Sequence, residues 1–131
     1  MRSIVSLETT FLVDLLRGVP AAVARGTALD KAGEPRCVTA PAASELLVGA
    51  HHLGGSELAR ATALLDSLTL LDFDLEACHE AGRIGASLIA RGETMGTIDL
   101  LIAAITKRHG QRLLTRDRGF ARVQGLGVET Y

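Results

Sequence analysis

The sequence predicts an α/β protein in which helices cover both faces of a mostly parallel β-sheet. Short apolar runs rich in strand-forming residues alternate along the chain with longer segments whose apolar residues recur at helical spacing. This alternation favours parallel strands joined by right-handed crossovers. Hydrophobic residues make up 47% of the 131 residues and aromatic residues 3%, so the core must be aliphatic. The length fits a single domain over residues 1–131.

The first predicted unit is a buried strand over residues 4–7 followed by a helix over residues 11–17. We expect Thr9 or Thr10 to cap this helix, because hydroxyl residues precede its first apolar turn. Glu8 therefore lies at the carboxyl end of a strand and just before a helix. In an open parallel sheet this edge is where ligands bind.

The remaining elements follow in alternation. Further strands are expected over residues 37–39, 69–73, 113–115 and 128–130, and further helices over residues 21–32, 42–51, 56–67, 75–91 and 98–109. We expect Ser56, Asp74 and Thr97 to cap the last three helices. The helix over 98–109 is apolar on nearly every side, which predicts a central position. The helix over 75–91 has an apolar and small-residue stripe that should face the core: Leu75, Cys78, Gly82, Gly85, Leu88 and Ile89.

Composition excludes several classes of function. The net charge is −1, from 14 basic and 15 acidic residues, so the chain has no overall basic field for nucleic acid. Few aromatic residues also argue against base stacking as the main binding mode.

Cys37 and Cys78 form no metal-binding pattern, and we expect free, buried thiols in a reducing compartment. No signal peptide or membrane-length apolar run is visible, which predicts a cytoplasmic protein without a membrane partner.

Four acidic residues stand out by their placement. Glu8 and Asp117 follow predicted strands, Asp99 lies in the first turn of the most apolar helix, and Glu45 lies on the helix after the second strand. Because elements that follow parallel strands begin at one edge of the sheet, these carboxylates are expected to converge. Each also has a purely structural alternative: helix-dipole stabilisation for Glu8 and Asp99, a turn or cap for Asp117, and simple exposure for Glu45.

Converging carboxylates would repel one another unless some were protonated or a cation neutralised them. Oxygen ligands select Mg²⁺ or Mn²⁺ rather than Zn²⁺, and acidic sites that hold Mg²⁺ serve phosphoryl chemistry. Neighbouring hydroxyls are candidates to orient the carboxylates, and neighbouring arginines are candidates to contact phosphates. These residues are Thr9, Thr10 and Thr115, and Arg17, Arg116, Arg118 and Arg122.

Four segments, in order and at matching spacing, resemble PIN-domain ribonucleases, and in particular the VapC-type toxins of prokaryotic toxin–antitoxin pairs. They are residues 7–18, 44–50, 96–104 and 114–120. The resemblance implies a three-layer α/β/α sandwich and a Mg²⁺- or Mn²⁺-dependent endoribonuclease that cleaves RNA phosphodiester bonds. It also implies a small antitoxin partner and a homodimer. Carried over by position, the catalytic and metal-binding residues are Glu8, Glu45, Asp99 and Asp117; Asp14 matches a less strictly acidic position and is left out.

One departure from the family pattern bears on activity. The first acid is usually Asp, and Glu8 places its carboxylate about 1.5 Å further from the backbone. Metal–ligand distances tolerate about 0.2 Å, so the site must adjust or weaken. The alternative function is therefore a catalytically weakened or inactive PIN fold that binds RNA or an antitoxin. A phospho-receiver domain is a third possibility, but Lys31 and Lys107 both fall on predicted helices rather than at a strand end.

Overall fold

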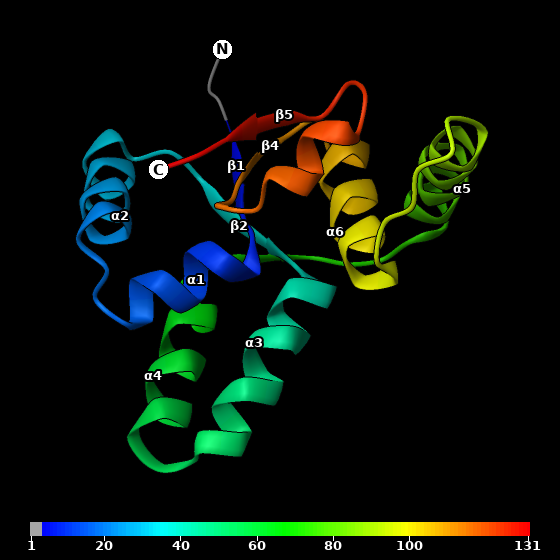
Figure 1. The fold of residues 1–131 in the computed structure, drawn as a ribbon. Helices are drawn as coiled ribbons and strands as arrows, with labels where there is room; N and C mark the ends of the chain where they lie inside the picture. Colours follow the sequence, from blue (N-terminus) through cyan, green and yellow to red (C-terminus); the bar gives the residue numbers. More distant parts are fainter. Residues whose placement is uncertain (1–3) are drawn as a thin grey trace.

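The structure, a computed structural model, describes residues 4–131 and places a parallel β-sheet at its centre (Figure 1). The strands are β1 (Val5–Leu7), β2 (Arg36–Thr39), β3 (Thr69–Leu71), β4 (Arg112–Leu114) and β5 (Gly127–Glu129). Their order in the sheet is β3-β2-β1-β4-β5, and every pair is parallel. The predicted α/β class with a mostly parallel sheet is confirmed.

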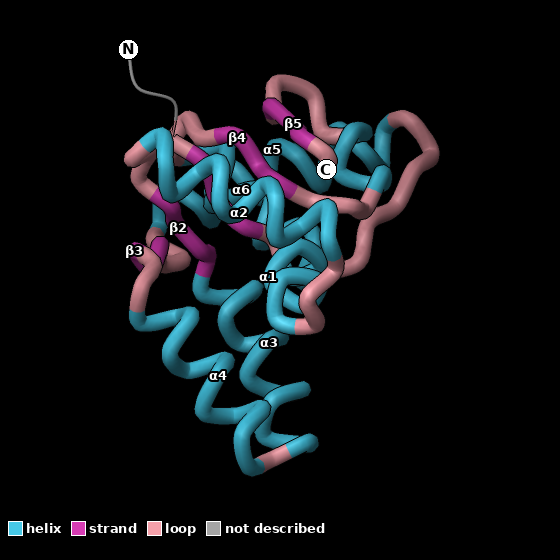
Figure 2. Tube along the Cα trace, turned by 90° about the vertical axis from the view of Figure 1, so that its left-hand side faces the viewer, coloured by secondary structure: helices cyan, strands magenta, loops and turns pink. Residues whose placement is uncertain are grey.

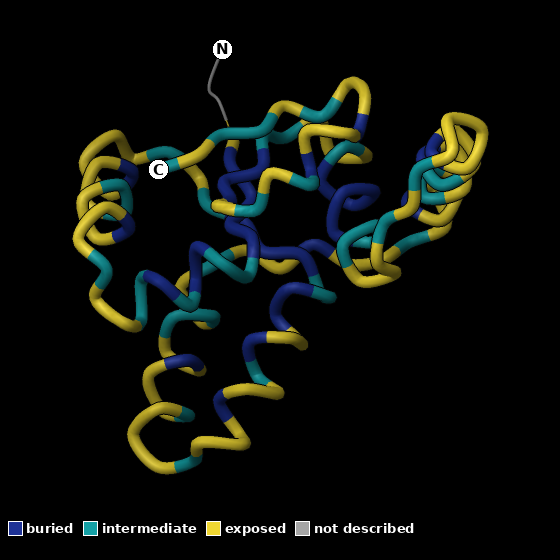
Figure 3. The backbone as a smooth tube through the Cα atoms, viewed as in Figure 1, coloured by how far each residue is buried: buried dark blue, intermediate teal, exposed yellow. Residues whose placement is uncertain are grey.

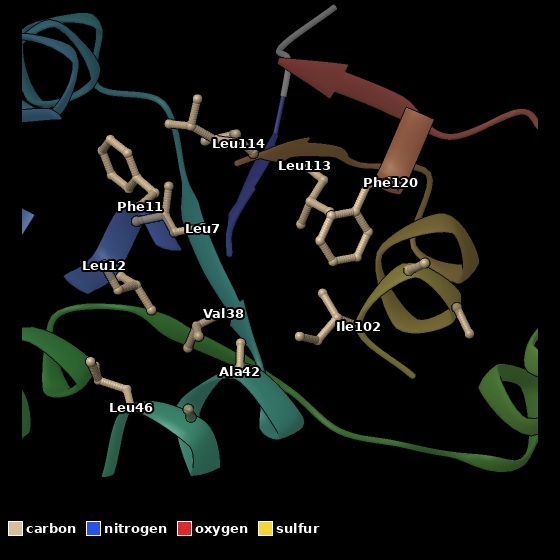
Figure 4. Packing of buried hydrophobic residues seen from close by; sticks show 14 of the residues in the cluster. Leu7, Phe11, Leu12, Val38, Ala42, Leu46, Ile102, Leu113, Leu114 and Phe120 are labelled. Carbon is tan, nitrogen blue, oxygen red and sulfur yellow. The ribbon is translucent and has the colours of Figure 1, made fainter. Parts of the chain in front are cut away.

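Within residues 4–131, six α-helices and one 3₁₀ helix connect the strands. They are α1 (Thr9–Leu16), α2 (Pro20–Ala32), α3 (Ala40–Leu53), α4 (Gly55–Asp66), α5 (Leu75–Ala90), α6 (Thr97–Arg108) and η1 (Arg118–Arg122). Figure 4 shows Phe11, Leu12 and Leu46 on one side of the strands, and Ile102 and Phe120 on the other. This arrangement gives the helix, sheet and helix layers of the predicted sandwich.

The α3–α4 hairpin extends beyond the carboxyl edge of the sheet, as the two perpendicular views show (Figures 1 and 2). α3 begins directly after β2, and its first turns pack against α1 and α6. The hairpin turn requires glycine, because Gly54 and Gly55 have φ angles of 71° and 55°. Residues of α3 near its start therefore stand at the sheet edge where β1 and β4 end.

The core is aliphatic, as composition predicted, and is concentrated in the sheet and the helix faces turned toward it (Figure 3). In α6, five consecutive residues from Ile102 to Thr106 are buried, which confirms its central position. Alanines within this run allow close approach to the sheet and to α3. Cys37 and Cys78 are both free thiols; Cys37 is buried, but Cys78 is exposed, contrary to expectation.

The predicted inward stripe of α5 is right only at Leu88, which is buried, and at the half-buried Gly85; its other members are exposed. Leu75 and Ile89 are 70% and 75% exposed, and the buried positions are Ala77, Ile84 and Leu88. α5 packs mainly on α6 rather than on the sheet. Because this contact buries only a narrow face of α5, the rest of the helix faces outward. No helix among residues 4–131 has the length and apolarity needed to cross a membrane.

Helix caps also differ from expectation at three places. Glu8 caps α1 in place of the expected Thr9 or Thr10, while Gly54 and Gly96 precede α4 and α6. Asp74 does cap α5, with its carboxylate accepting from Ala77 N at 2.9 Å. At α1 the reason is that Glu8 is the last extended residue after β1, with φ −81° and ψ 159°.

Candidate functional site

The structure places all four predicted acids at the carboxyl edge of the sheet. Glu8 joins β1 to α1, and Asp117 joins β4 to η1, where its side chain accepts from Gly119 N–H. Glu45 lies in the second turn of α3, and Asp99 lies in the first turn of α6. Four separate elements thus bring one carboxylate each to this edge.

Glu8 is the most firmly held of these side chains, and it is 3% exposed. Its Oε1 atom accepts from the Thr10 hydroxyl at 2.6 Å, from Thr10 N–H at 3.2 Å, and from the Thr115 hydroxyl. Hydrogen bonds to a buried carboxylate stabilise its charged form, which otherwise is costly to bury. The threonines therefore fix the position of the Glu8 carboxylate.

The same two hydroxyls connect Glu8 to the loop that carries Asp117. Thr115 Oγ1 accepts from Asp117 N–H at 2.9 Å, and Thr10 Oγ1 accepts from Arg116 N–H at 3.1 Å. A hydroxyl has one proton, and here each donates it to Glu8. The 3.3 Å contact between the two threonine oxygens is therefore a close approach of acceptors. A shift of the β4–η1 loop would move Glu8 with it.

The other acids are held more loosely. Thr9 Oγ1 donates to Glu45 Oε1 at 2.7 Å, and Gly119 N–H donates to Asp117 Oδ1 at 2.8 Å. Among the described residues, hydrogen bonds to Glu8, Glu45 and Asp117 each end on a single oxygen. The second oxygen of each carboxylate remains available for a ligand.

The electrostatics of Asp99 show that the four acids act on one another. Burial raises the pKa of Asp99 above its usual value, and the charges of Asp117, Glu8 and Glu45 raise it further. Arg122 is nearby and opposes this effect. The ionised site is thus strained by like charge.

The donors fit a hard divalent cation in chemistry, because they are carboxylate oxygens with free lone pairs in a repulsive group. Their spacing is wider than a metal cage: within residues 4–131, no three His, Cys, Asp or Glu side chains are arranged to hold one ion. In Glu8, three hydrogen bonds hold Oε1 at Thr10 and Thr115. Binding an ion would require the carboxylates to close by side-chain rotation.

A fifth carboxylate, which the sequence analysis left out of the site, lies beside the four acids. Asp14 on α1 is 7% exposed and accepts two hydrogen bonds from the Arg116 guanidinium, at 2.9 and 3.2 Å. Tyr131 donates its hydroxyl to the same carboxylate at 2.6 Å and packs edge-on against Phe11. The Tyr131 bond is the largest cause that lowers the pKa of Asp14. Arg116 is thereby fixed next to Asp117.

The other candidate arginines differ in their surroundings. Arg17 and Arg118 are exposed at the protein surface. Arg122 is engaged with backbone: its Nε donates to Gly119 O at 3.1 Å, and its Nη1 donates to Thr94 O. Arg122 therefore lies against the same glycine that Asp117 contacts.

Comparison with known proteins agrees with this architecture. A relative named ribonuclease VapC1, from Rickettsia felis, is 36% identical over 93 residues, which cover 66% of this chain and 69% of the relative. A relative from Salmonella typhimurium, named tRNA(fMet)-specific endonuclease VapC, is 30% identical over 98 residues, covering 72% and 74% of the two chains.

Solved structures share the fold. A crystal structure of VapBC2 from Rickettsia felis, bound to a DNA fragment from its promoter, superposes with a TM-score of 0.84. The match covers 98% of each chain at 21% identity. Residues 5–126, from β1 to the segment before β5, match the PIN domain family model. This protein therefore belongs to the PIN-domain family.

Proposed function

We propose that this protein is a Mg²⁺- or Mn²⁺-dependent endoribonuclease, the toxin of a toxin–antitoxin pair. The observation that carries the proposal is the group formed by Glu8, Glu45, Asp99 and Asp117, in which three carboxylates keep one oxygen free of hydrogen bonds. Family membership supports the same function, as do the ribonuclease and endonuclease names of two relatives.

Glu8, Asp99 and Asp117 would hold the cation, with Glu45 at the more exposed side of the group. When bound, such an ion supplies a water of lowered pKa and stabilises charge on the phosphate oxygens. Thr10 and Thr115 orient the Glu8 carboxylate. Arg116, with its side chain 58% exposed and fixed by Asp14, is available to bind an RNA phosphate beside Asp117.

A second function, RNA or antitoxin binding without turnover, is favoured by one specific observation. The described acids do not form a metal cage as oriented, and Glu8 is bound to threonines through Oε1. In this alternative the longer Glu8 side chain is the cause of inactivity. Shortening it by Glu8→Asp would then produce cleavage that the natural protein lacks.

The test of the proposed function is cleavage of a circular, labelled RNA in Mn²⁺, because loss of a circle requires an internal cut. We expect linear products with the wild type, none in EDTA, and none with Asp99→Asn. Asp66→Asn is the matched control, since it removes an exposed carboxylate at the end of α4 and should leave cleavage intact. Cutting by Asp99→Asn at the wild-type rate would reject the site.

The proposal includes two protein contacts and a compartment. We propose that a small antitoxin covers an apolar groove between α1, α3 and α4, lined by Val13, Leu16, Leu46, Ala50 and Leu53 among others. We also propose a homodimer, supported by the exposed Leu75 and Ile89 on α5. The free thiols of Cys37 and Cys78 suit the cytoplasm. Co-purification with the neighbouring gene product, followed by mass measurement in solution, tests both contacts.

A further inference from the structure

A basic cavity of about 180 Å³ lies between α5, α6 and the segment that follows η1. Four cationic side chains line it, together with one carboxylate, that of Glu80; the four are Arg83, Arg91, Lys107 and Arg122. On a chain whose net charge is −1, this is a local concentration of positive charge. The cavity belongs neither to the acidic group nor to the apolar groove.

The single carboxylate does not neutralise the cavity. Glu80 accepts from Arg83 at 2.8 Å and pairs with Lys107 at 3.1 Å, so two cations share one anion. Arg91 is held at the other end, where its Nη2 donates to Arg122 O at 2.8 Å and lies 3.5 Å from Glu93. Counting Glu93 as well, four cations face two anions.

One residue joins this cavity to the acidic group. Arg122 lines the cavity, and its Nε donates to Gly119 O at 3.1 Å. The N–H of the same glycine donates to Asp117 at 2.8 Å. Gly119 therefore links Arg122, at one end of the cavity, to Asp117, a proposed cation-binding carboxylate. From Arg122 the cavity continues along α5 toward Arg83.

We propose that this cavity binds a backbone phosphate of the RNA substrate, on a nucleotide adjacent to the one that is cut. The inference rests on the proposed function for its substrate class. Guanidinium groups bind phosphate through paired N–H donors, and a chain of phosphates would pass from the acidic group over Arg122 into the cavity. Arg83, 65% exposed, turns from Glu80 to the phosphate, while Lys107 keeps Glu80 paired.

The test measures affinity for a fluorescein-labelled, mixed-sequence, single-stranded RNA oligonucleotide in EDTA, on an Asp99→Asn background. Arg83→Gln should weaken binding about threefold to tenfold and reduce the slope of log Kd against log salt by about 0.7, the value for one phosphate contact on a single strand. Arg83→Lys, which keeps the charge, should restore most of the affinity.

Arg108→Gln is the matched control: it removes the same charge one residue from Lys107, but its partner is Asp74 at 3.2 Å, outside the cavity. The RNA affinity and salt slope of Arg108→Gln should match those of the Asp99→Asn protein that carries neither further substitution. Equal effects of Arg83→Gln and Arg108→Gln, or no effect of either, would overturn the phosphate site.

The binding test separates this inference from the proposed function. If the wild type cleaves RNA but Arg83→Gln binds RNA as the parent does, the nuclease stands and the phosphate site is rejected. If no cleavage occurs in any metal but RNA affinity depends on Arg83, the phosphate site stands and the catalytic proposal fails. Arg83 is exposed, so Arg83→Gln should unfold at the same denaturant concentration as its parent.

Discussion

Thr115→Val tests the hydrogen bonds that hold Glu8. Thr115 is fully buried, donates its hydroxyl to Glu8 Oε1, and accepts from Asp117 N–H at 2.9 Å. Valine has nearly the same shape, so the substitution removes the hydrogen bonds while filling the space. Losing a bond to a charged group costs about 1.5–3 kcal/mol, and an unpaired donor costs about 1–3 kcal/mol more.

Because Thr10 still donates to Glu8 and Asp117 N–H is partly accessible, we expect a total loss of about 2–4 kcal/mol in the free energy of unfolding. The free energy of unfolding of a domain of this kind is about 5–15 kcal/mol, so the variant should remain folded. Urea denaturation at neutral pH in EDTA measures the difference.

Thr106→Val is the matched control. Thr106 is also fully buried, but its hydroxyl donates at 2.8 Å to Ile102 O, a carbonyl within the same helix. The lost bond is uncharged and leaves no buried donor, so the expected cost is about 0.5–1.5 kcal/mol. If Thr115→Val costs no more than Thr106→Val, the hydrogen bonds of Thr115 to Glu8 and Asp117 do not stabilise the fold and the reasoning is refuted.

Three further predictions follow from the site. Glu8→Asp shortens the side chain by about 1.5 Å, to the length of the acid usual in the family, and should raise Mn²⁺-dependent RNA cleavage about tenfold; an unchanged rate would show that Glu8 does not limit activity. Asp99 has a raised pKa in the folded protein, so its ionisation costs stability as pH rises above 3.8. Asp99→Asn should therefore melt at a higher temperature than the wild type at neutral pH in EDTA, and the gap should close below pH 3.8; a lower melting temperature would contradict the repulsion. Asp14 has a lowered pKa, so its bond from Tyr131 adds stability above pH 3.8 that is lost as pH falls further. Tyr131→Phe should lower the neutral-pH melting temperature, with the difference shrinking in acid; a constant difference would assign the effect to packing.

The sequence was enough to predict the strands and helices that depend on residues close together in the chain. Strand runs such as residues 113–115 and the helical spacing around α6 depend on neighbours in the chain, and within residues 4–131 the five strands and six α-helices lie close to the expected ranges. The parallel order then placed Glu8 and Asp117 at one edge, because both follow strands. Their catalytic role, the metal, and the extent of the domain over residues 1–131 stay predictions.

Long-range contacts were beyond sequence reasoning. Nothing in the sequence near Asp14 indicates Tyr131, which lies 117 positions further along the chain. Leu88 was correctly placed on the inward face of α5, but Leu75 and Ile89 were not, because the apolar residues of this helix exceed what its contact with α6 can bury. The cap of α1 was missed because glutamate is an unusual cap residue, and its role depends on β1 ending at Leu7.

The most direct test of the central claim is the initial rate of RNA cleavage across a Mn²⁺ titration, for the wild type and for Asp99→Asn. Four carboxylates that share a cation predict a rate that rises with Mn²⁺ and saturates in the wild type, and no cleavage in the variant at any concentration. Cleavage that persists in EDTA, or that Asp99→Asn leaves unchanged, would contradict the account.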